Sequence, residues 1–178
     1  MRILLNYLLA LVGTILPFAS MAQSGDQYYL PKLGQMVIDI NKATNLNSIG
    51  LMYGYGITKH FSLEAELNSS LSGGTYTKED ALGNVTEKGE YQVRTLAAYA
   101  AVRKILWGSV YAKGKVGVLF ETVERSSDRD QTSSDDSIGF AGGLGAGAYL
   151  FEHLTMELEA TQIDRNIVFY SLGMHIRF

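Results

Sequence analysis

Apolar and polar residues alternate along most of this chain, and this alternation limits its possible folds more than any other feature. From residue 34 onward the dominant period is two, as in residues 61–71, where most odd-numbered positions are apolar and the even-numbered ones are polar. Residues 154–163 and 167–178 repeat the pattern. Because successive side chains of a β-strand point to opposite faces, this period predicts strands with one apolar and one polar face. The chain is therefore expected to be all-β.

Turn-like breaks divide the alternating region into eight segments of strand length. After the N-terminal region, no stretch approaches the roughly 18 unbroken apolar residues of a membrane helix. An antiparallel barrel can still enter a membrane, because alternate residues of each strand supply its apolar exterior. The eight expected strands cover approximately residues 34–40, 48–57, 61–71, 91–103, 109–125, 137–150, 154–163 and 167–178.

The connections between these segments alternate in length. Short links on one rim and longer polar links on the other are typical of outer-membrane barrels. The pattern predicts an eight-stranded antiparallel up-and-down transmembrane β-barrel, with an exported soluble sandwich or lipocalin-like barrel as the alternative. The short links are residues 58–60, 104–108 and 151–153, and the others are 41–47, 72–90, 126–136 and the brief 164–166.

The N-terminal residues have the composition of an export signal. Arg2 precedes an apolar run that Pro17 ends well short of a bilayer span, and a small-x-small cleavage pattern follows at Ser20 and Ala22. An uncleaved anchor helix is the alternative. The absence of cysteine excludes a lipid-anchored lipoprotein and a disulfide scaffold. We expect a signal peptide at residues 1–22, cleaved after Ala22, and a single barrel domain at residues 23–178.

If the apolar face is outward, charged side chains fill the lumen, where they must pair or stay hydrated. An eight-stranded barrel is just wide enough for side chains to fill it, so we expect a structural network of ion pairs, with a proton or ion path as the alternative. Asp39 and His175 could add charge. The expected network consists of Glu64, Glu66, Arg94, Lys113, Lys115, Glu121, Glu157, Glu159 and Arg177.

The expected strand register brings opposite charges together in this lumen. A short turn after the sixth segment places Gly147 opposite Glu157, and a long loop centred near Gln131 places Lys115 opposite Gly147. Since glycine has no side chain, the lysine stem can cross the glycine strand. We therefore expect Lys115 to contact Glu157 or Glu159.

Aromatic residues on the outward face are expected to form two girdles at the membrane interfaces. Tyr55, Phe61, Trp107 and Phe178 are assigned to the short-turn rim, and Tyr91, Phe120, Phe140 and Tyr170 to the long-loop rim.

The signal peptide, the eight alternating segments, the glycine-rich strands and the terminal Tyr170-Ser-Leu-Gly-Met-His-Ile-Arg-Phe178 resemble the small outer-membrane β-barrel proteins related to outer-membrane protein X and to the transmembrane domain of outer-membrane protein A. The resemblance covers essentially the whole mature chain. It implies a monomer in the bacterial outer membrane, in contact with lipid and lipopolysaccharide. It also implies that the barrel-assembly machinery recognises a C-terminal signal made of Tyr170, Leu172, Met174, Ile176 and Phe178.

Other functional classes have little support in the sequence. The chain has 15 Lys and Arg against 18 Asp and Glu, so nucleic acid is a poor partner. Three scattered histidines without cysteine, and a glycine run that departs from G-x-G-x-x-G, predict no metal and no cofactor. His60-Phe61-Ser62 superficially resembles the His-x-Ser of lipid A deacylases, but it is expected on the rim away from lipopolysaccharide. No catalytic residue is expected.

The expected function is therefore non-enzymatic: a structural or surface-interaction role in envelope integrity, adhesion or environmental contact through the extracellular loops. A narrow porin-like channel is the first alternative, and a lipid A-modifying enzyme is the second. The ligand of the loops is not readable from the sequence.

Overall fold

The computed structural model describes residues 25, 27–38, 43–79, 85–127, 132–151 and 153–177. The expected signal peptide, Asp39 and Phe178 lie outside these residues. The described residues form nine antiparallel strands, and they include no helix long and apolar enough to cross a membrane. The strands are β1 (Gln27–Ile38), β2 (Leu46–Gly56), β3 (Phe61–Ser70), β4 (Gly74–Glu79), β5 (Val85–Trp107), β6 (Val110–Ser127), β7 (Thr132–Phe151), β8 (Leu154–Asp164) and β9 (Ile167–Arg177).

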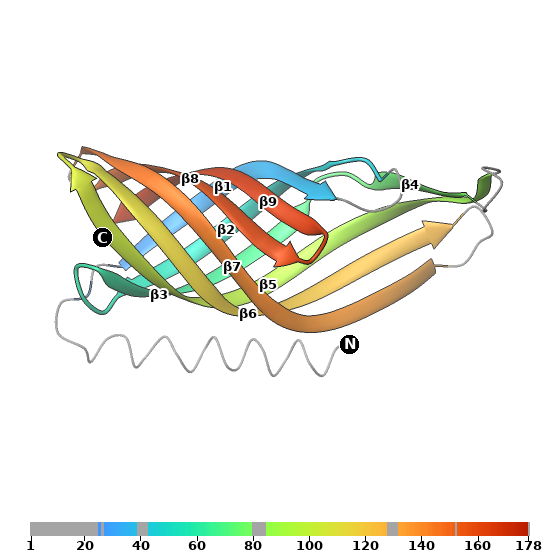
Figure 1. Cartoon of the computed structure of the whole chain (residues 1–178), viewed down its shortest axis with the longest axis horizontal. Helices are drawn as coiled ribbons and strands as arrows, with labels where there is room; N and C mark the ends of the chain where they lie inside the picture. Colours follow the sequence, from blue (N-terminus) through green and yellow to red (C-terminus); the bar gives the residue numbers. More distant parts are fainter. Residues whose placement is uncertain are drawn as a thin grey trace.

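These strands form one closed barrel, as Figure 1 shows. Each strand pairs with its sequence neighbours, except that β3 and β4 lie one after the other along β5 and together act as one barrel strand. Pairing of β1 with β9 joins the two ends of the chain. The predicted eight-stranded antiparallel barrel is thus confirmed.

The two faces of the strands differ as predicted. In β3, Ser62, Glu64 and Glu66 are buried in the lumen, whereas Leu63 and Leu67 are exposed on the outside. The same division holds in β8 and in β9. The exterior therefore carries an apolar belt suited to lipid.

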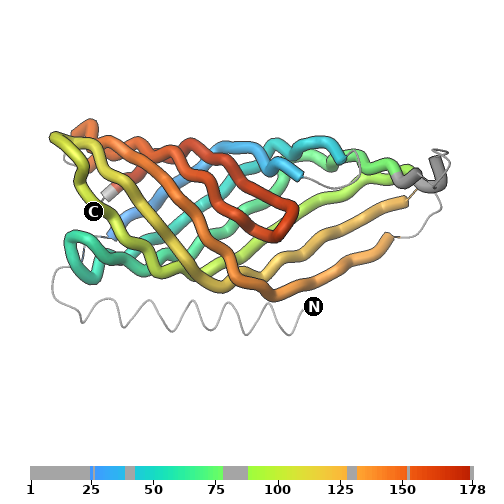
Figure 2. The backbone as a smooth tube through the Cα atoms, in the orientation of Figure 1, coloured from blue at the N-terminus to red at the C-terminus, as the bar shows by residue number. Residues whose placement is uncertain are grey.

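Three strands extend far beyond the others. β5, β6 and β7 continue past the turn between β8 and β9, and β4 pairs with the extension of β5 (Figures 1 and 2). The sequence predicted loops over residues 72–90 and 126–136, where these extensions lie. The prediction was wrong there because the extensions expose polar residues on both faces, which removes the apolar alternation that marks a strand.

The first strand also differs from its prediction. β1 begins at Gln27 rather than near residue 34. Its inward residues Tyr28 and Leu30 are apolar like their outward neighbours, so both faces look alike in the sequence. A strand of this kind has no period of two in its hydropathy.

The register was predicted correctly across the short turn but not across the long loop. Gly147 pairs with Glu157, as expected. Lys115 pairs with Gly143 instead of Gly147, because the ladder closes at the pair Ser126 and Thr132 and is centred before Gln131. A shift of the loop centre moves every pairing by twice that amount, which explains why Lys115 pairs with Gly143 and not with Gly147.

Candidate functional site

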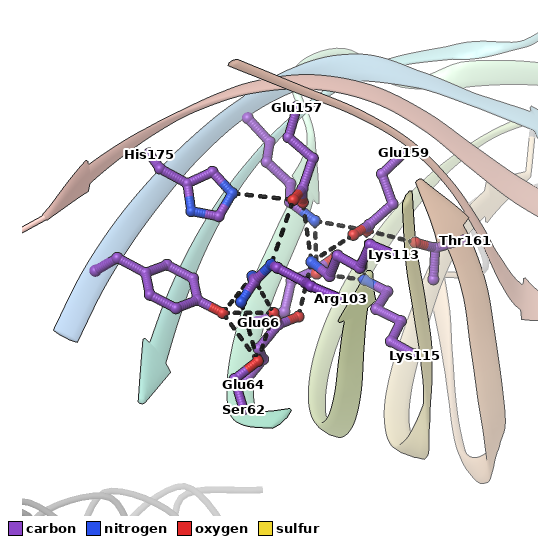
Figure 3. Close-up of polar contacts among 12 residues, drawn as sticks. Ser62, Glu64, Glu66, Arg103, Lys113, Lys115, Glu157, Glu159, Thr161 and His175 are labelled. Atoms are coloured by element: carbon purple, nitrogen blue, oxygen red, sulfur yellow. Dashed lines mark hydrogen bonds and ion pairs between the residues drawn. The ribbon is translucent and has the colours of Figure 1, made fainter. Parts of the chain in front are cut away.

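The middle of the lumen holds two layers of ion pairs (Figure 3). In the first layer, Lys32 and Lys115 alternate with Glu66 and Glu159. The Lys32 ammonium lies 2.7 Å from an oxygen of each glutamate. The Lys115 ammonium lies 2.7 Å from Glu66 and 2.5 Å from Glu159. The predicted contact between Lys115 and Glu159 is confirmed.

The second layer consists of Arg103 and Lys113 with Glu64 and Glu157. Lys113 Nζ is 2.9 Å from both glutamates and also 2.9 Å from Glu159, which links the two layers. Arg103 Nη2 is 2.7 Å from Glu64, and its Nε is 3.9 Å from Glu157. We call these eight residues the charged layers. Four carboxylates face four cations, so the formal charges of the layers balance.

Hydroxyl and imidazole groups complete the coordination of the second layer. The Tyr28 hydroxyl donates to Glu64 at 2.5 Å and accepts from Arg103 at 2.5 Å. The Tyr111 hydroxyl donates to Glu157 at 2.6 Å, and His175 Nε2 lies 3.0 Å from the same carboxylate. Buried charges need such partners, because an unpaired one would have lost its hydration without compensation.

Inward-facing glycines provide the space for these large side chains. A Cβ at Gly54 would overlap the ring of Tyr28, and one at Gly147 would overlap the ring of Tyr111. The Lys115 stem passes Gly143, where an added Cβ would lie 3.1 Å from its Cε. The sequence correctly indicated that glycines leave lumen space, but Gly147 accommodates a tyrosine and Gly143 the lysine.

Apolar side chains fill the lumen on the side of the long loops, and we call them the apolar plug. Tyr99 joins the two regions, since Lys115 Nζ lies 4.1 Å from the centroid of its ring. The charged layers and the apolar plug therefore fill the lumen at successive levels. The buried members are Met36, Ile38, Leu46, Tyr91, Val93, Ala97, Tyr99, Leu119, Ala141, Ile163, Ile167 and Phe169.

Arg94 was assigned to the lumen, and this was wrong. Its side chain is 58% exposed and lies 3.5 Å from Glu124 on the outside. Arg103 occupies the lumen instead. Even-numbered and odd-numbered residues of β5 face opposite sides of the barrel wall. Assigning Arg94 to the inward face therefore placed Arg103 outward and excluded it from the network. The side chain of Arg177 lies outside what the structure describes.

Lys32, Tyr28 and Tyr111 were absent from the predicted network. Lys32 and Tyr28 precede the first expected strand, so no face could be assigned to them. Tyr111 is on the inward face of β6 with Lys113 and Lys115, and this parity is the signal that could have found it.

Tyr91 was assigned to the outer girdle, and this was also wrong. It is only 6% exposed and belongs to the apolar plug, and its hydroxyl donates to the Thr44 carbonyl at 2.5 Å. Its neighbours on the inward face of β5 are themselves apolar, so hydrophobicity does not distinguish the two faces there. The other described girdle residues lie on outward positions. Trp107, Phe140 and Tyr170 are exposed, and Tyr55, Phe61 and Phe120 are half-buried.

The described part of the proposed assembly signal also faces outward. Tyr170, Leu172, Met174 and Ile176 are all exposed on β9.

The His60 and Ser62 side chains do not form a catalytic pair. His60 Nδ1 lies 3.2 Å from the Arg103 carbonyl oxygen in an exposed turn, whereas the Ser62 hydroxyl is buried and accepts from Arg103. Among the described residues, no group of three or more acidic, histidine or cysteine side chains is arranged to bind a metal.

The extension of β7 has an open edge. Residues 132–141 pair with β6 on one side, but the pairing of β7 with β8 begins only at Gly142 and Gln162. No described residue pairs with the other side of this stretch. Residues 132–140 are all exposed, Phe140 by 90%. In Figure 1 this part of β7 projects beyond the turn between β8 and β9.

Glu121 lies beside this edge and outside the charged layers. Its side chain is only 5% exposed. One carboxylate oxygen accepts from the Ser137 hydroxyl at 3.5 Å, and the other has no hydrogen-bond partner among the described residues. It was predicted in the lumen network. The structure leaves it on the inner face of the extension, with no cation in contact among the described residues.

Comparisons with known proteins agree with this geometry. The family model described as outer membrane protein beta-barrel domain matches residues 8–174. Among curated proteins, none has a sequence that matches this chain.

Three solved structures show the same fold at low identity. A major outer membrane protein from Thermus thermophilus has a TM-score of 0.64 and 10% identity, over 88% of this chain and 100% of its own. Neisserial surface protein A has a TM-score of 0.62 and 12% identity, over 88% and 100%. The attachment invasion locus protein of Yersinia pestis, in complex with the heparin analogue sucrose octasulfate, has a TM-score of 0.54 and 15% identity, over 88% of this chain and 100% of its own.

Proposed function

Because this chain belongs to the outer-membrane β-barrel family, we propose that it is a sealed, non-enzymatic barrel that presents the open edge of β7 at the cell surface to bind an extended segment of a partner. Two of its structural neighbours are described by their names as a surface protein and an attachment protein, which supports a surface role.

The open edge of β7 is the observation that carries this proposal. A strand without a neighbour exposes a row of backbone N–H and C=O groups, and an added strand can pair with them. Soluble proteins usually protect such edges. Here the edge extends over residues 132–141. Residues 132–137 lie beyond the apolar belt, which reaches Ile138 opposite Phe120, and exposed side chains are present on both faces of the edge. This geometry suits recognition of an extended peptide.

The filled lumen supports a scaffold rather than a channel. The charged layers and the apolar plug occupy the interior at successive levels, and their members are almost fully buried. We expect the purified protein to give no steady conductance in planar lipid bilayers. Stable single-channel steps from the wild-type protein would contradict the sealed barrel and favour the porin-like alternative.

Peptide binding to the protein in lipid nanodiscs tests the edge directly. A library of random nine-residue peptides should yield binders that protect backbone amides of residues 132–141 from hydrogen exchange. Single prolines at Ser133 and at Ser134 provide matched variants, because adjacent residues direct their N–H groups to opposite sides of a strand. One proline should abolish binding without loss of the β6 pairing. Binders that protect only other surfaces would overturn the proposal.

The remaining expectations belong to the same proposal. Residues 1–22 are removed on export, so the mature protein begins at Gln23. The mature barrel is a monomer in contact with lipopolysaccharide. The outward residues of β9 act as the assembly signal with Phe178. N-terminal sequencing of the membrane-inserted protein tests the cleavage, and deletion of Phe178 should lower the inserted fraction.

A further inference from the structure

We propose that the segment bound at the β7 edge carries a lysine or arginine that pairs with Glu121. This inference rests on the proposed function and names the chemistry of the partner: an extended, basic peptide segment. It follows from one buried carboxylate that the described part of the chain leaves without a cation.

Glu121 differs from the other buried glutamates. Glu64, Glu66, Glu157 and Glu159 each have a cationic nitrogen within 2.9 Å. Glu121 is also shielded from solvent, yet it has only a 3.5 Å hydrogen bond from Ser137, and one of its oxygens lacks any described partner. A buried carboxylate without compensation is costly, so a charged partner from outside would be bound strongly.

The carboxylate contacts β7, the strand that has the open edge. Ser137 and Gly139 lie on the same face of β7 as Glu121 does on β6, and both are small. A Cβ at Gly139 would meet nothing within 4 Å, so this part of the face is open. Strands are spaced by about 5 Å, which places an added strand about 10 Å from β6. A long lysine or arginine side chain on its inner face can cross β7 and reach Glu121.

The charges around the edge favour the same partner. β6 crosses the apolar belt up to Phe120, so Glu121 lies just beyond the belt. Burial and the nearby Asp164 carboxylate raise the pKa of Glu121, and the hydrogen bond from Ser137 and the charge of Arg125 lower it by less. Arg125 is already engaged with Asp135 at 3.5 Å.

A second copy of this chain is a poor occupant of the edge. Full antiparallel overlap of two β7 edges would bring Asp135 and Asp136 of both copies close together, and like charges on adjacent strands are destabilising.

The experiment repeats the peptide selection on variants of the full-length protein in nanodiscs. Wild-type protein should enrich lysine or arginine at one peptide position. The Glu121→Gln variant should lose this preference and bind the selected basic peptides roughly tenfold more weakly. The Glu121→Lys variant should instead select an acidic residue at that position. Asp136→Asn, which removes an exposed charge on the opposite face, is the matched control and should keep the preference for the basic residue.

The outcomes separate this inference from the proposed function. Peptides that bind the edge equally well with or without a basic residue, or whose preference survives in Glu121→Gln, would overturn the role of Glu121 but retain the edge as a binding site. The absence of any peptide bound at residues 132–141 would overturn both. Circular dichroism and heat-modifiable gel mobility verify that each variant is folded before the selection.

Discussion

The charged layers and the region around Glu121 both bury carboxylates inside one barrel, but only the charged layers provide them with cations from the described residues. In the layers, Lys113 alone contacts three glutamates on two different strands. Around Glu121, the one described hydrogen bond comes from Ser137, and Arg125 on the same face is paired with Asp135 instead. The difference indicates that the layers stabilise a closed scaffold, whereas the extension has a buried carboxylate without a described cation beside an open strand edge.

The layers also connect strands that are far apart in the sequence. Lys32 on β1 bridges Glu66 on β3 and Glu159 on β8, while Lys115 comes from β6. Because the members share opposite charges as neighbours, removing one leaves its partners buried with less compensation. We therefore expect strong coupling within the layers and little coupling to Glu121.

The largest effect is expected for Lys113→Met, which removes a cation shared by three buried carboxylates. The free energy of unfolding should fall by about 4 kcal/mol, as when one partner of a buried ion pair is removed. Urea titrations in lipid vesicles measure this change. Lys104→Met, at an exposed position, is the control. The double variant with Glu157→Gln should recover part of the loss, and strictly additive effects would contradict the network.

Leu119→Ala should have the next largest effect, because this residue is nearly fully buried in the apolar plug. Loss of the side chain and the resulting cavity should cost about 3 kcal/mol of stability. The matched variant Leu67→Ala, on the exposed outer face, should cost less in the same titration. Equal losses would mean that the plug is not packed as described.

A cation on the outer face should lower the stability of the inserted protein, whereas the cations in the layers raise it. Leu158→Arg places a guanidinium in the apolar belt and should destabilise the inserted protein by at least about 2 kcal/mol. Gln92→Arg, on the outward face beyond the belt, is the control and should be nearly neutral. If both variants titrate alike, the belt has been placed incorrectly.

The smallest effect should be a gain. Glu121→Gln removes a buried charge that has no cation among the described residues, so stability should rise by about 1 kcal/mol at neutral pH. Glu159→Gln, in contrast, should lower it. A loss of stability in Glu121→Gln would show that the wild-type protein already provides a partner for this carboxylate.

Particular residues show how far the sequence could predict this arrangement. The faces of β3, β8 and β9 followed from alternation, and the pairing of Gly147 with Glu157 followed from a short turn. Arg94 and Tyr91 were placed wrongly because β5 has apolar residues on its inward face, where hydrophobicity alone cannot assign a side.

The open edge could not be predicted. It depends on where β8 ends relative to β7, and strand register across a long loop is poorly determined by local sequence. The extension is polar on both faces and therefore resembles a loop. Glu121 could be placed in the lumen by its parity, but its lack of a cation becomes visible only in three dimensions.

Amide hydrogen exchange along β7 of the wild-type protein, followed by NMR in nanodiscs, tests the central claim most directly. Residues 142–148 pair with both β6 and β8 and should be protected at successive positions. Residues 132–141 should be protected only at alternate positions, where the N–H groups face β6, because the others face the open edge. Protection at every position from 132 to 141 would contradict an open edge and the binding function based on it.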